Sequence, residues 1–116
     1  MKKVVITFIS VLILSLIAFG CIDEKGSSGR NNYYKDKKTF FEVNGRNNYE
    51  VVFIGDSITD YADWEDLFPQ FDIANRGIKG DTTDGVIERI DSINSTGASK
   101  AFLMIGINDI YRGVGN

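Results

Sequence analysis

Three short apolar runs, each followed by a turn rich in Gly, Asn and Asp, set the pattern of the second half of the chain. The first run, Val51 to Ile54, is mostly β-branched and stops at Gly55, which is typical of a strand buried on both faces. A weaker run at 72–75 and a strong run at 101–105 predict two further strands. We therefore expect three short strands separated by helical segments.

The segments between these strands carry helical patterns. A helix is expected from about Ser57, and the clearest helix lies between the second and third strands and ends at Gly97. Its N-cap and apolar residues follow helical spacing, and they are Asp81, Thr82, Thr83, Val86, Ile87, Ile90 and Ile93. This order predicts an α/β fold with a parallel sheet, helices on both faces and ligands at the carboxyl ends of the strands.

The N-terminus has the pattern of an export signal. Two lysines precede an uncharged apolar run, Val4 to Phe19, which is short of the roughly twenty residues that a membrane span needs. We therefore predict a signal peptide at 1–20. The residues up to Cys21 resemble a bacterial lipoprotein signal, which implies lipidation of Cys21 and attachment to the extracytoplasmic face of the cell membrane. The alternative is an uncleaved anchor with a buried Cys.

The residues after Cys21 are predicted to be a flexible tether that reaches to about residue 38. Glycines, serines, asparagines and charges alternate there, so little apolar surface offsets the entropy lost on ordering. A short helix from Tyr33 to Val43 is the alternative for the end of this segment. The predicted organisation is therefore a signal peptide at 1–20, a lipidated tether at 21–38 and a folded region at 39–116.

Composition narrows the function. The 116 residues are 43% hydrophobic and carry 13 Lys and Arg against 16 Asp and Glu, a net charge of −3 that disfavours nucleic acid as a partner. The sequence contains no His, so no imidazole base or imidazole metal ligand comes from these residues. The single Cys excludes a disulfide within the chain. We expect no cofactor.

Three polar turns follow the three predicted strands, and a parallel sheet brings them to one edge. A Ser at a helix start exposes its hydroxyl and its N–H, a Gly lets a second N–H approach closely, and an Asn adds a neutral side-chain donor. Each turn alone is more typical of a structural cap. Together and in this order, one nucleophile and three donors favour acyl transfer. The turns are Gly55 to Thr59, Asn75 to Thr83 and Gly106 to Asp109.

These turns resemble the sequence blocks of the GDSL or SGNH hydrolases, which are serine esterases, thioesterases and carbohydrate deacetylases. The Gly-Asp-Ser that ends at Ser57 is similar to the first block and implies that Ser57 is the nucleophile. The run before Asp81 is similar to the branch of the platelet-activating-factor acetylhydrolases and sugar acetylesterases. This similarity implies that Gly80 gives its N–H to the oxyanion and that Gly77 shapes the turn.

The third turn is similar to the Gly-x-Asn-Asp block, which implies Asn108 as the side-chain oxyanion donor. Asp56 and Asp109 are expected to support their turns through hydrogen bonds. The resemblance implies a three-layer, flavodoxin-like α/β/α fold with strand order 2-1-3-4-5. The matching blocks cover 50–110, about half of a usual domain of this family. We therefore expect a fragment truncated after the third strand, with a missing C-terminal half, an unpaired apolar edge and poor solubility.

One departure from the family bears on activity. Its members carry an Asp-x-x-His near the C-terminus, in which His is the general base for Ser, and this sequence has neither. Asp56 and Asp109 are poor substitutes, because an ordinary Asp pKa is about 3.9. The resemblance therefore predicts a serine esterase for short acyl or acetyl esters, including those of carbohydrates, and an inactive state for this polypeptide alone.

One alternative function involves the same residues. A non-catalytic membrane-anchored lipoprotein could use the rim formed by Ser57, Gly80 and Asn108 to bind carbohydrate or acyl groups. A metal site is not expected, because the carboxylates between 60 and 66 fit a solvated helix face better than a ligand set. Those carboxylates belong to Asp60, Asp63, Glu65 and Asp66. The nearby Trp64 is expected to pack in the core or rim, or to stack on a sugar.

Overall fold

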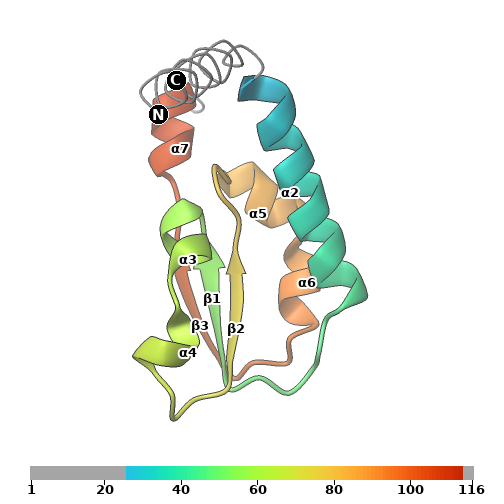
Figure 1. Ribbon diagram of the computed structural model, residues 1–116, viewed down its shortest axis with the longest axis vertical. Coiled ribbons are helices and arrows are strands. Elements are labelled where there is room, and N and C mark those ends of the chain that lie inside the picture. The colour runs from blue at the N-terminus through green and yellow to red at the C-terminus, as the bar shows by residue number, and fades with distance from the viewer. Residues whose placement is uncertain (1–25, 114–116) are drawn as a thin grey trace, which may run out of the picture.

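The computed structural model describes residues 26–113, which form a three-stranded sheet with helices on both faces (Figure 1). The α/β fold predicted from the sequence is confirmed. The strands are β1 (Val51–Gly55), β2 (Ile73–Gly77) and β3 (Lys100–Met104). The helices are α2 (Gly26–Val43), α3 (Ser57–Tyr61), α4 (Trp64–Leu67), α5 (Thr83–Glu88), α6 (Ile90–Asn94) and α7 (Ile107–Arg112).

All three strands are parallel and lie in the order β2-β1-β3. The central strand β1 begins with Val51 opposite Ile73 and Lys100. It ends with Gly55 opposite Gly77 and Met104, so the carboxyl ends of the strands coincide. This register places the three following turns at one edge of the sheet.

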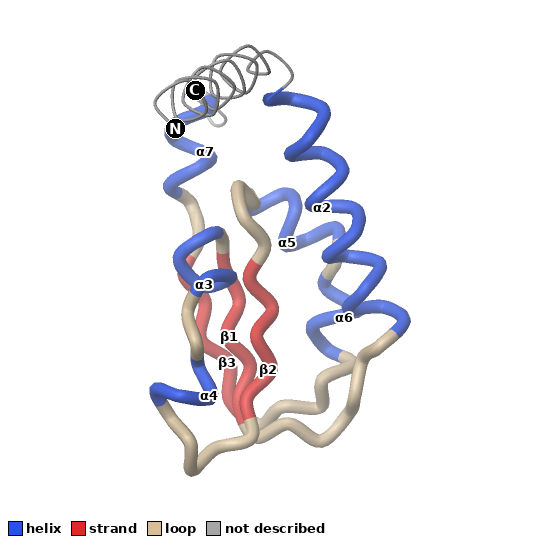
Figure 2. Tube along the Cα trace, viewed as in Figure 1, coloured by secondary structure: helices blue, strands red, loops and turns tan. Residues whose placement is uncertain are grey.

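Helices α2, α5 and α6 lie on one side of the sheet, and α3 and α4 lie on the other (Figure 2). Alternate residues of β1 face the two layers, as expected of a strand. Val52 and Ile54 belong to the core cluster beneath α5 and α6, together with Ala74, Val86 and Ile93. On the opposite face, the rings of Phe53 and Trp64 stack with their centroids 3.8 Å apart. Trp64 therefore packs against the sheet, as expected for a core or rim residue.

The segment predicted to be a flexible tether is helical from Gly26 onward, as part of α2. Contacts far away in the sequence explain this difference. The Tyr33 hydroxyl donates to Asp60 Oδ2 at 2.7 Å, and the Tyr34 hydroxyl donates to the Gly85 carbonyl at 2.8 Å. Because these partners lie on α3 and α5, tertiary contacts offset the ordering entropy that the local composition does not. The shorter helix at Tyr33 to Val43 is contained in α2.

The helix predicted after Asp81 is divided into α5 and α6 by Arg89, which has a non-helical conformation. Thr82 is its N-cap, and its hydroxyl accepts a hydrogen bond from the Gly85 N–H. The predicted helix has four apolar residues that were expected to face the core, and two of them, Ile87 and Ile90, are instead exposed. A single face of this short helical pair meets the sheet, and it carries the buried Val86 and Ile93.

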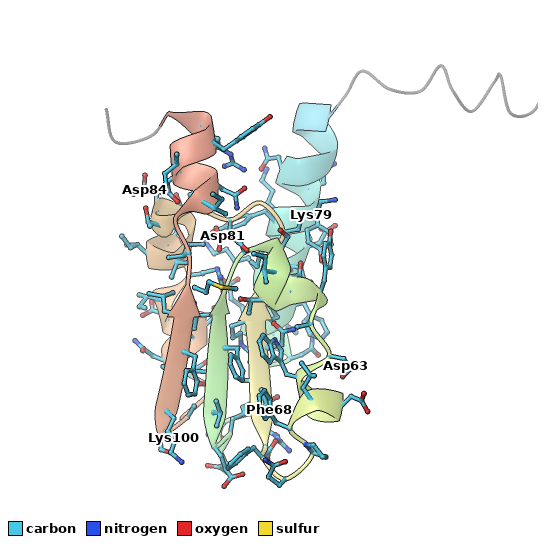
Figure 3. The ribbon with its side chains drawn as sticks, turned by 90° about the vertical axis from the view of Figure 1, so that its left-hand side faces the viewer. Asp63, Phe68, Lys79, Asp81, Asp84 and Lys100 are labelled. Carbon is cyan, nitrogen blue, oxygen red and sulfur yellow. The ribbon has the colours of Figure 1, made fainter. Side chains whose placement is uncertain are left out.

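Strand β3 is the uncovered edge of the sheet, and all five of its residues are exposed. The other edge strand, β2, has four of its five residues buried, because α3 packs on it. Figure 3 shows β3 without a helix in front of it on the face that carries α3 and α4. The predicted unpaired apolar edge is therefore present in this part of the chain. Among the described residues, no helix is both long and apolar enough to cross a bilayer.

Candidate active site

The three predicted turns converge at the carboxyl end of the sheet (Figure 1). Ser57 is the first residue of α3, Gly80 lies in the turn before α5, and Asn108 is the second residue of α7. Each turn thus contributes one of the three residues expected at the site. Cys21, which is expected to be lipidated, lies outside the described residues.

The first turn presents Ser57 directly after the central strand. Asp56 is buried and caps α3, with its Oδ1 accepting a hydrogen bond from the Ile58 N–H at 3.0 Å. Gly55 lets the chain bend closely here, because a Cβ at this position would lie 2.3 Å from Thr59 Oγ1 and 2.4 Å from the Met104 carbonyl oxygen. The Asp56 cap and the close packing at Gly55 therefore fix the backbone around Ser57.

The second turn is held against the first. The Ile78 N–H donates to the Gly55 carbonyl at 3.0 Å. Gly77 packs closely on α3, since a Cβ there would lie 2.2 Å from the Asp60 nitrogen. Gly80 has φ +74°, a left-handed conformation that favours glycine, and its carbonyl accepts a hydrogen bond from Arg112 Nη2 at 2.5 Å. These contacts fix the loop that carries the predicted oxyanion donor.

Asn108 connects the third turn to the other two. Its Nδ2 donates to the Asp81 carbonyl at 2.9 Å and lies 3.5 Å from Asp56 Oδ2. Asp109 anchors the same helix, because its carboxylate accepts hydrogen bonds from the Thr83 N–H at 3.1 Å and from the Thr83 hydroxyl at 2.5 Å. The hydroxyl bond lowers the pKa of Asp109 below its ordinary value. The side chain of Asn108 is thereby oriented between the turns that carry Ser57 and Gly80.

The three turns bring together a serine hydroxyl and groups that can donate hydrogen bonds, but no base is hydrogen-bonded to that hydroxyl among the described residues. Within 26–113, no hydrogen bond is formed by the Ser57 hydroxyl, and the sequence contains no His. A hydroxyl without a base keeps a pKa near that of an alcohol, which makes it a weak nucleophile at neutral pH. Among the described residues, none is therefore placed to activate the Ser57 hydroxyl by a hydrogen bond.

Two features near the site are not evident from the sequence pattern. The first is a buried ion pair between Asp81 and Arg89, with Arg89 Nη2 2.8 Å from Asp81 Oδ2. The second is the burial of Asp60, whose side chain is 2% exposed and pairs with Lys37 at 2.8 Å. Asp60 also accepts a hydrogen bond from the Lys79 N–H, so the prediction that it lies on a solvated helix face is wrong. The sequence offers no signal for the ion pair, because only residues three or four apart are neighbours on a helix and Asp81 and Arg89 are eight apart.

The region around Trp64 is apolar and lies away from the three turns. A cavity of about 260 Å³ is lined by residues from the first halves of the strands and from the α4 region, namely Val51, Phe53, Trp64, Phe68, Phe71, Ile73, Lys100 and Phe102. Helix α4 lies toward the amino ends of the strands (Figure 1). Within the described part of the chain, no group of three or more His, Cys, Asp or Glu side chains could hold a metal ion.

Comparison with known proteins shows a likeness to a solved structure. No protein-family model and no curated protein matches the sequence. A solved structure from Streptococcus pneumonia, described as that of a candidate platelet activating factor, is similar at 27% identity with a TM-score of 0.60. The match covers 90% of this chain and 47% of that structure, so the chain spans about half of its length. This likeness agrees with the α/β fold and with the resemblance to the GDSL-type hydrolases.

Proposed function

We propose that this chain carries the nucleophile and oxyanion half of a serine ester hydrolase site. The observation that supports it most is the position of Asn108, whose amide lies between the Asp81 carbonyl and Asp56 and so joins the three turns. A neutral amide held 3.5 Å from the carboxylate of the residue before Ser57, which begins a helix, is suited to binding a carbonyl oxygen as it becomes negative. The likeness to the streptococcal structure points in the same direction.

The proposed reaction is acyl transfer to Ser57. A base from outside these 116 residues accepts the Ser57 proton while Oγ attacks the ester carbonyl carbon. The backbone N–H groups of Ser57 and Gly80 and the Nδ2 group of Asn108 donate hydrogen bonds to the oxyanion. The bond to the leaving alcohol then breaks, and the alcohol takes the proton. Water releases the acyl group from Oγ as a carboxylic acid.

Short acyl esters are the proposed substrates, including acetyl groups on carbohydrates. The side chains next to the reacting residues are apolar and exposed, since Ile58 follows Ser57 and Ile107 precedes Asn108. An apolar rim around neutral hydrogen-bond donors suits an uncharged acyl ester better than a charged substrate. With imidazole present as the base, hydrolysis of p-nitrophenyl acetate should therefore exceed that of an ester with a charged acyl group, such as p-nitrophenyl hemisuccinate, and the reverse order would contradict this assignment.

Addition of free imidazole tests the reaction, because it can supply the base. The rate of p-nitrophenyl acetate hydrolysis with the full chain and imidazole together should exceed the sum of the rate with the chain alone and the rate with imidazole alone. Ser57→Ala should abolish this excess, and Asn108→Ala should lower it by about a hundredfold, as expected for loss of one oxyanion donor. Asn94→Ala, at an exposed position on α6, is the matched control and should leave the rate unchanged. An excess rate that survives in Ser57→Ala would contradict the proposal.

We further propose that the chain is exported and held at the outer face of the cell membrane through a lipid on Cys21. The apolar run Val4 to Phe19 behind two lysines supports export, and the position of Cys21 directly after it supports lipidation. Cells grown with a clickable palmitate analogue should label the protein, and Cys21→Ala should lose the label. Equal labelling of both forms would contradict lipidation at this residue.

A further inference from the structure

Asp81 and Arg89 form a buried ion pair beside the candidate active site. The side chains are 1% and 0% exposed, and Arg89 Nε donates to Asp81 Oδ2 at 2.9 Å. Among the described residues, no other group accepts a hydrogen bond from the Arg89 guanidinium. Buried charges are costly unless they are paired, so this pair holds its two partners together in one geometry.

The Asp81 carboxylate is fixed on its other side as well. Its Oδ1 accepts a hydrogen bond from the Thr82 N–H at 2.9 Å. Gly85 leaves room for it, because a Cβ at that position would lie 2.0 Å from Oδ1. The side chain of Asp81 therefore has a single place in the structure, and its position restrains the backbone of the same residue. Figure 3 shows Asp81 near the carboxyl ends of the strands.

The backbone carbonyl of Asp81 is the group that holds Asn108. It accepts a hydrogen bond from Asn108 Nδ2 at 2.9 Å, which uses one of the two N–H bonds of the amide. The second N–H has only Asp56 Oδ2 at 3.5 Å, a distance too long for a strong hydrogen bond. This second N–H can therefore donate a hydrogen bond to a substrate oxygen. The direction in which it points depends on the bond between the first N–H and the Asp81 carbonyl.

We propose that Arg89 is a positioning residue of this site, because it fixes Asp81 and thereby orients the Asn108 amide toward the substrate oxygen. Arg89 itself lies out of reach of a substrate, since its side chain is fully buried. The catalytic consequence rests on the proposed function, in which Asn108 is an oxyanion donor. The effect on Asn108 orientation does not rest on it and can be measured separately.

The test is hydrogen exchange of the Asn108 side-chain amide, followed by NMR in the full chain and in Arg89→Lys. The lysine keeps the charge but loses the guanidinium fork, so the Asp81 carbonyl should move away from Asn108. Exchange of the Asn108 amide should rise about tenfold, the size expected for the loss of one net hydrogen bond. The backbone amides of Val52 and Ile54 should stay protected. The imidazole-dependent excess rate should also fall in Arg89→Lys, and the rate that remains should still be abolished by Ser57→Ala.

Arg76→Lys is the matched control, because Arg76 is also buried, but its guanidinium lies over the Phe41 ring and donates to the Asn75 carbonyl. Among the described residues, no hydrogen bond or ion pair joins Arg76 to Asp81. It should leave the Asn108 amide unchanged. Unchanged exchange in Arg89→Lys, or the same rise in both variants, would overturn the proposal. If Arg89→Lys also loses protection in β1, Asp81→Asn replaces it, since the amide keeps the size and the backbone carbonyl but removes the charge.

Asp81→Asn should show the same rise at Asn108 with β1 protected. Loss of β1 protection in this variant as well would overturn the proposal, because the pair would then hold the fold rather than the amide. If the wild-type chain shows no Ser57-dependent acyl transfer, the proposed function fails. The exchange result at Asn108 still decides whether Arg89 positions the amide.

Discussion

Glycines at the ends of β1 and β2 allow the chain to lie closer to the backbones of β3 and α3 than any side chain would permit. At Gly77 a Cβ would lie 2.2 Å from the Asp60 nitrogen, and at Gly55 it would lie 2.4 Å from the Met104 carbonyl oxygen. Both obstacles are backbone atoms, which cannot move aside as a flexible side chain could. These two residues therefore set the distance between the Ser57 turn and its neighbours.

Gly77→Ala should destabilise the fold more than a glycine substitution that meets no neighbouring atom. We expect a loss of about 3 kcal/mol in the free energy of unfolding, at the upper end of overpacking effects. Gly113→Ala is the control, because its φ of +68° adds backbone strain of about 1 kcal/mol, while a Cβ there would meet no atom of residues 26–113 within 4 Å. Urea unfolding measures both values. A smaller loss for Gly77→Ala than for Gly113→Ala would contradict the close packing of β2 on α3.

Tyr34 should make stability depend on alkaline pH. Burial, followed by the nearby charge of Asp81, raises the pKa of Tyr34 from 10.0 to about 12 in the folded chain. Its contribution is therefore complete below the unfolded pKa of about 10 and is lost as the pH rises through the folded value. Tyr34→Phe should lower stability at pH 8 and flatten its decline above pH 10, measured by urea unfolding. Tyr111→Phe, at an exposed position, should keep the wild-type decline, and an equal decline in Tyr34→Phe would argue against a raised pKa.

At the scale of elements, α2 holds together the two helices that follow the first and second turns of the site. Tyr33 and Lys37 both contact Asp60 on α3, and Tyr34 contacts the Gly85 carbonyl on α5. Each contact joins residues that are far apart in the sequence. The helix is thus part of the folded domain and packs beside α6 (Figure 2).

The two edges of the sheet differ in how they are protected. Strand β2 is covered, whereas β3 exposes a row of unpaired backbone groups with the apolar Phe102, Leu103 and Met104. An exposed apolar edge strand pairs readily with other chains. We therefore expect self-association of the folded chain through β3.

A lysine on β3 should reduce this self-association. Leu103→Lys places a charge on the edge strand, which natural sheets use against edge-to-edge pairing. Ile87→Lys is the matched control, because Ile87 on α5 is exposed to 67% against 61% for Leu103 but lies off the sheet. Sedimentation velocity should show fewer oligomers for Leu103→Lys and no change for Ile87→Lys. An equal effect of both lysines would indicate general solubility rather than edge pairing.

At the scale of the whole molecule, the sequence predicted what depends on short-range pattern. The apolar runs located the three strands within two residues, and Thr82 was foreseen as a cap, because strand burial and capping depend on adjacent residues. The part of α2 before Tyr33 was not predicted, because the contacts of this helix with Asp60 and Gly85 join distant positions. The exposure of Ile87 was not predicted for the same reason. Helical periodicity identifies the apolar face of a helix but not which of its residues contact the rest of the fold.

The candidate site could be predicted as a set of turns but not as a geometry. The parallel order implied that the turns of Ser57, Gly80 and Asn108 share one edge, and the structure places them there. The hydrogen bond from Asn108 to the Asp81 carbonyl, and the ion pair behind it, depend on side-chain conformations that no local pattern encodes. The catalytic roles of these three residues stay a prediction.

The most direct test of the central proposal is to locate the acyl group after reaction. The full chain is incubated with p-nitrophenyl acetate and imidazole, quenched in acid and mapped by peptide mass spectrometry. We predict one acetyl group on Ser57 Oγ, formed as p-nitrophenol leaves, with Asn108→Ala slowing its formation by about a hundredfold. Acetyl groups spread over lysines and tyrosines, equally abundant in Ser57→Ala, would contradict a serine hydrolase site at this edge of the sheet.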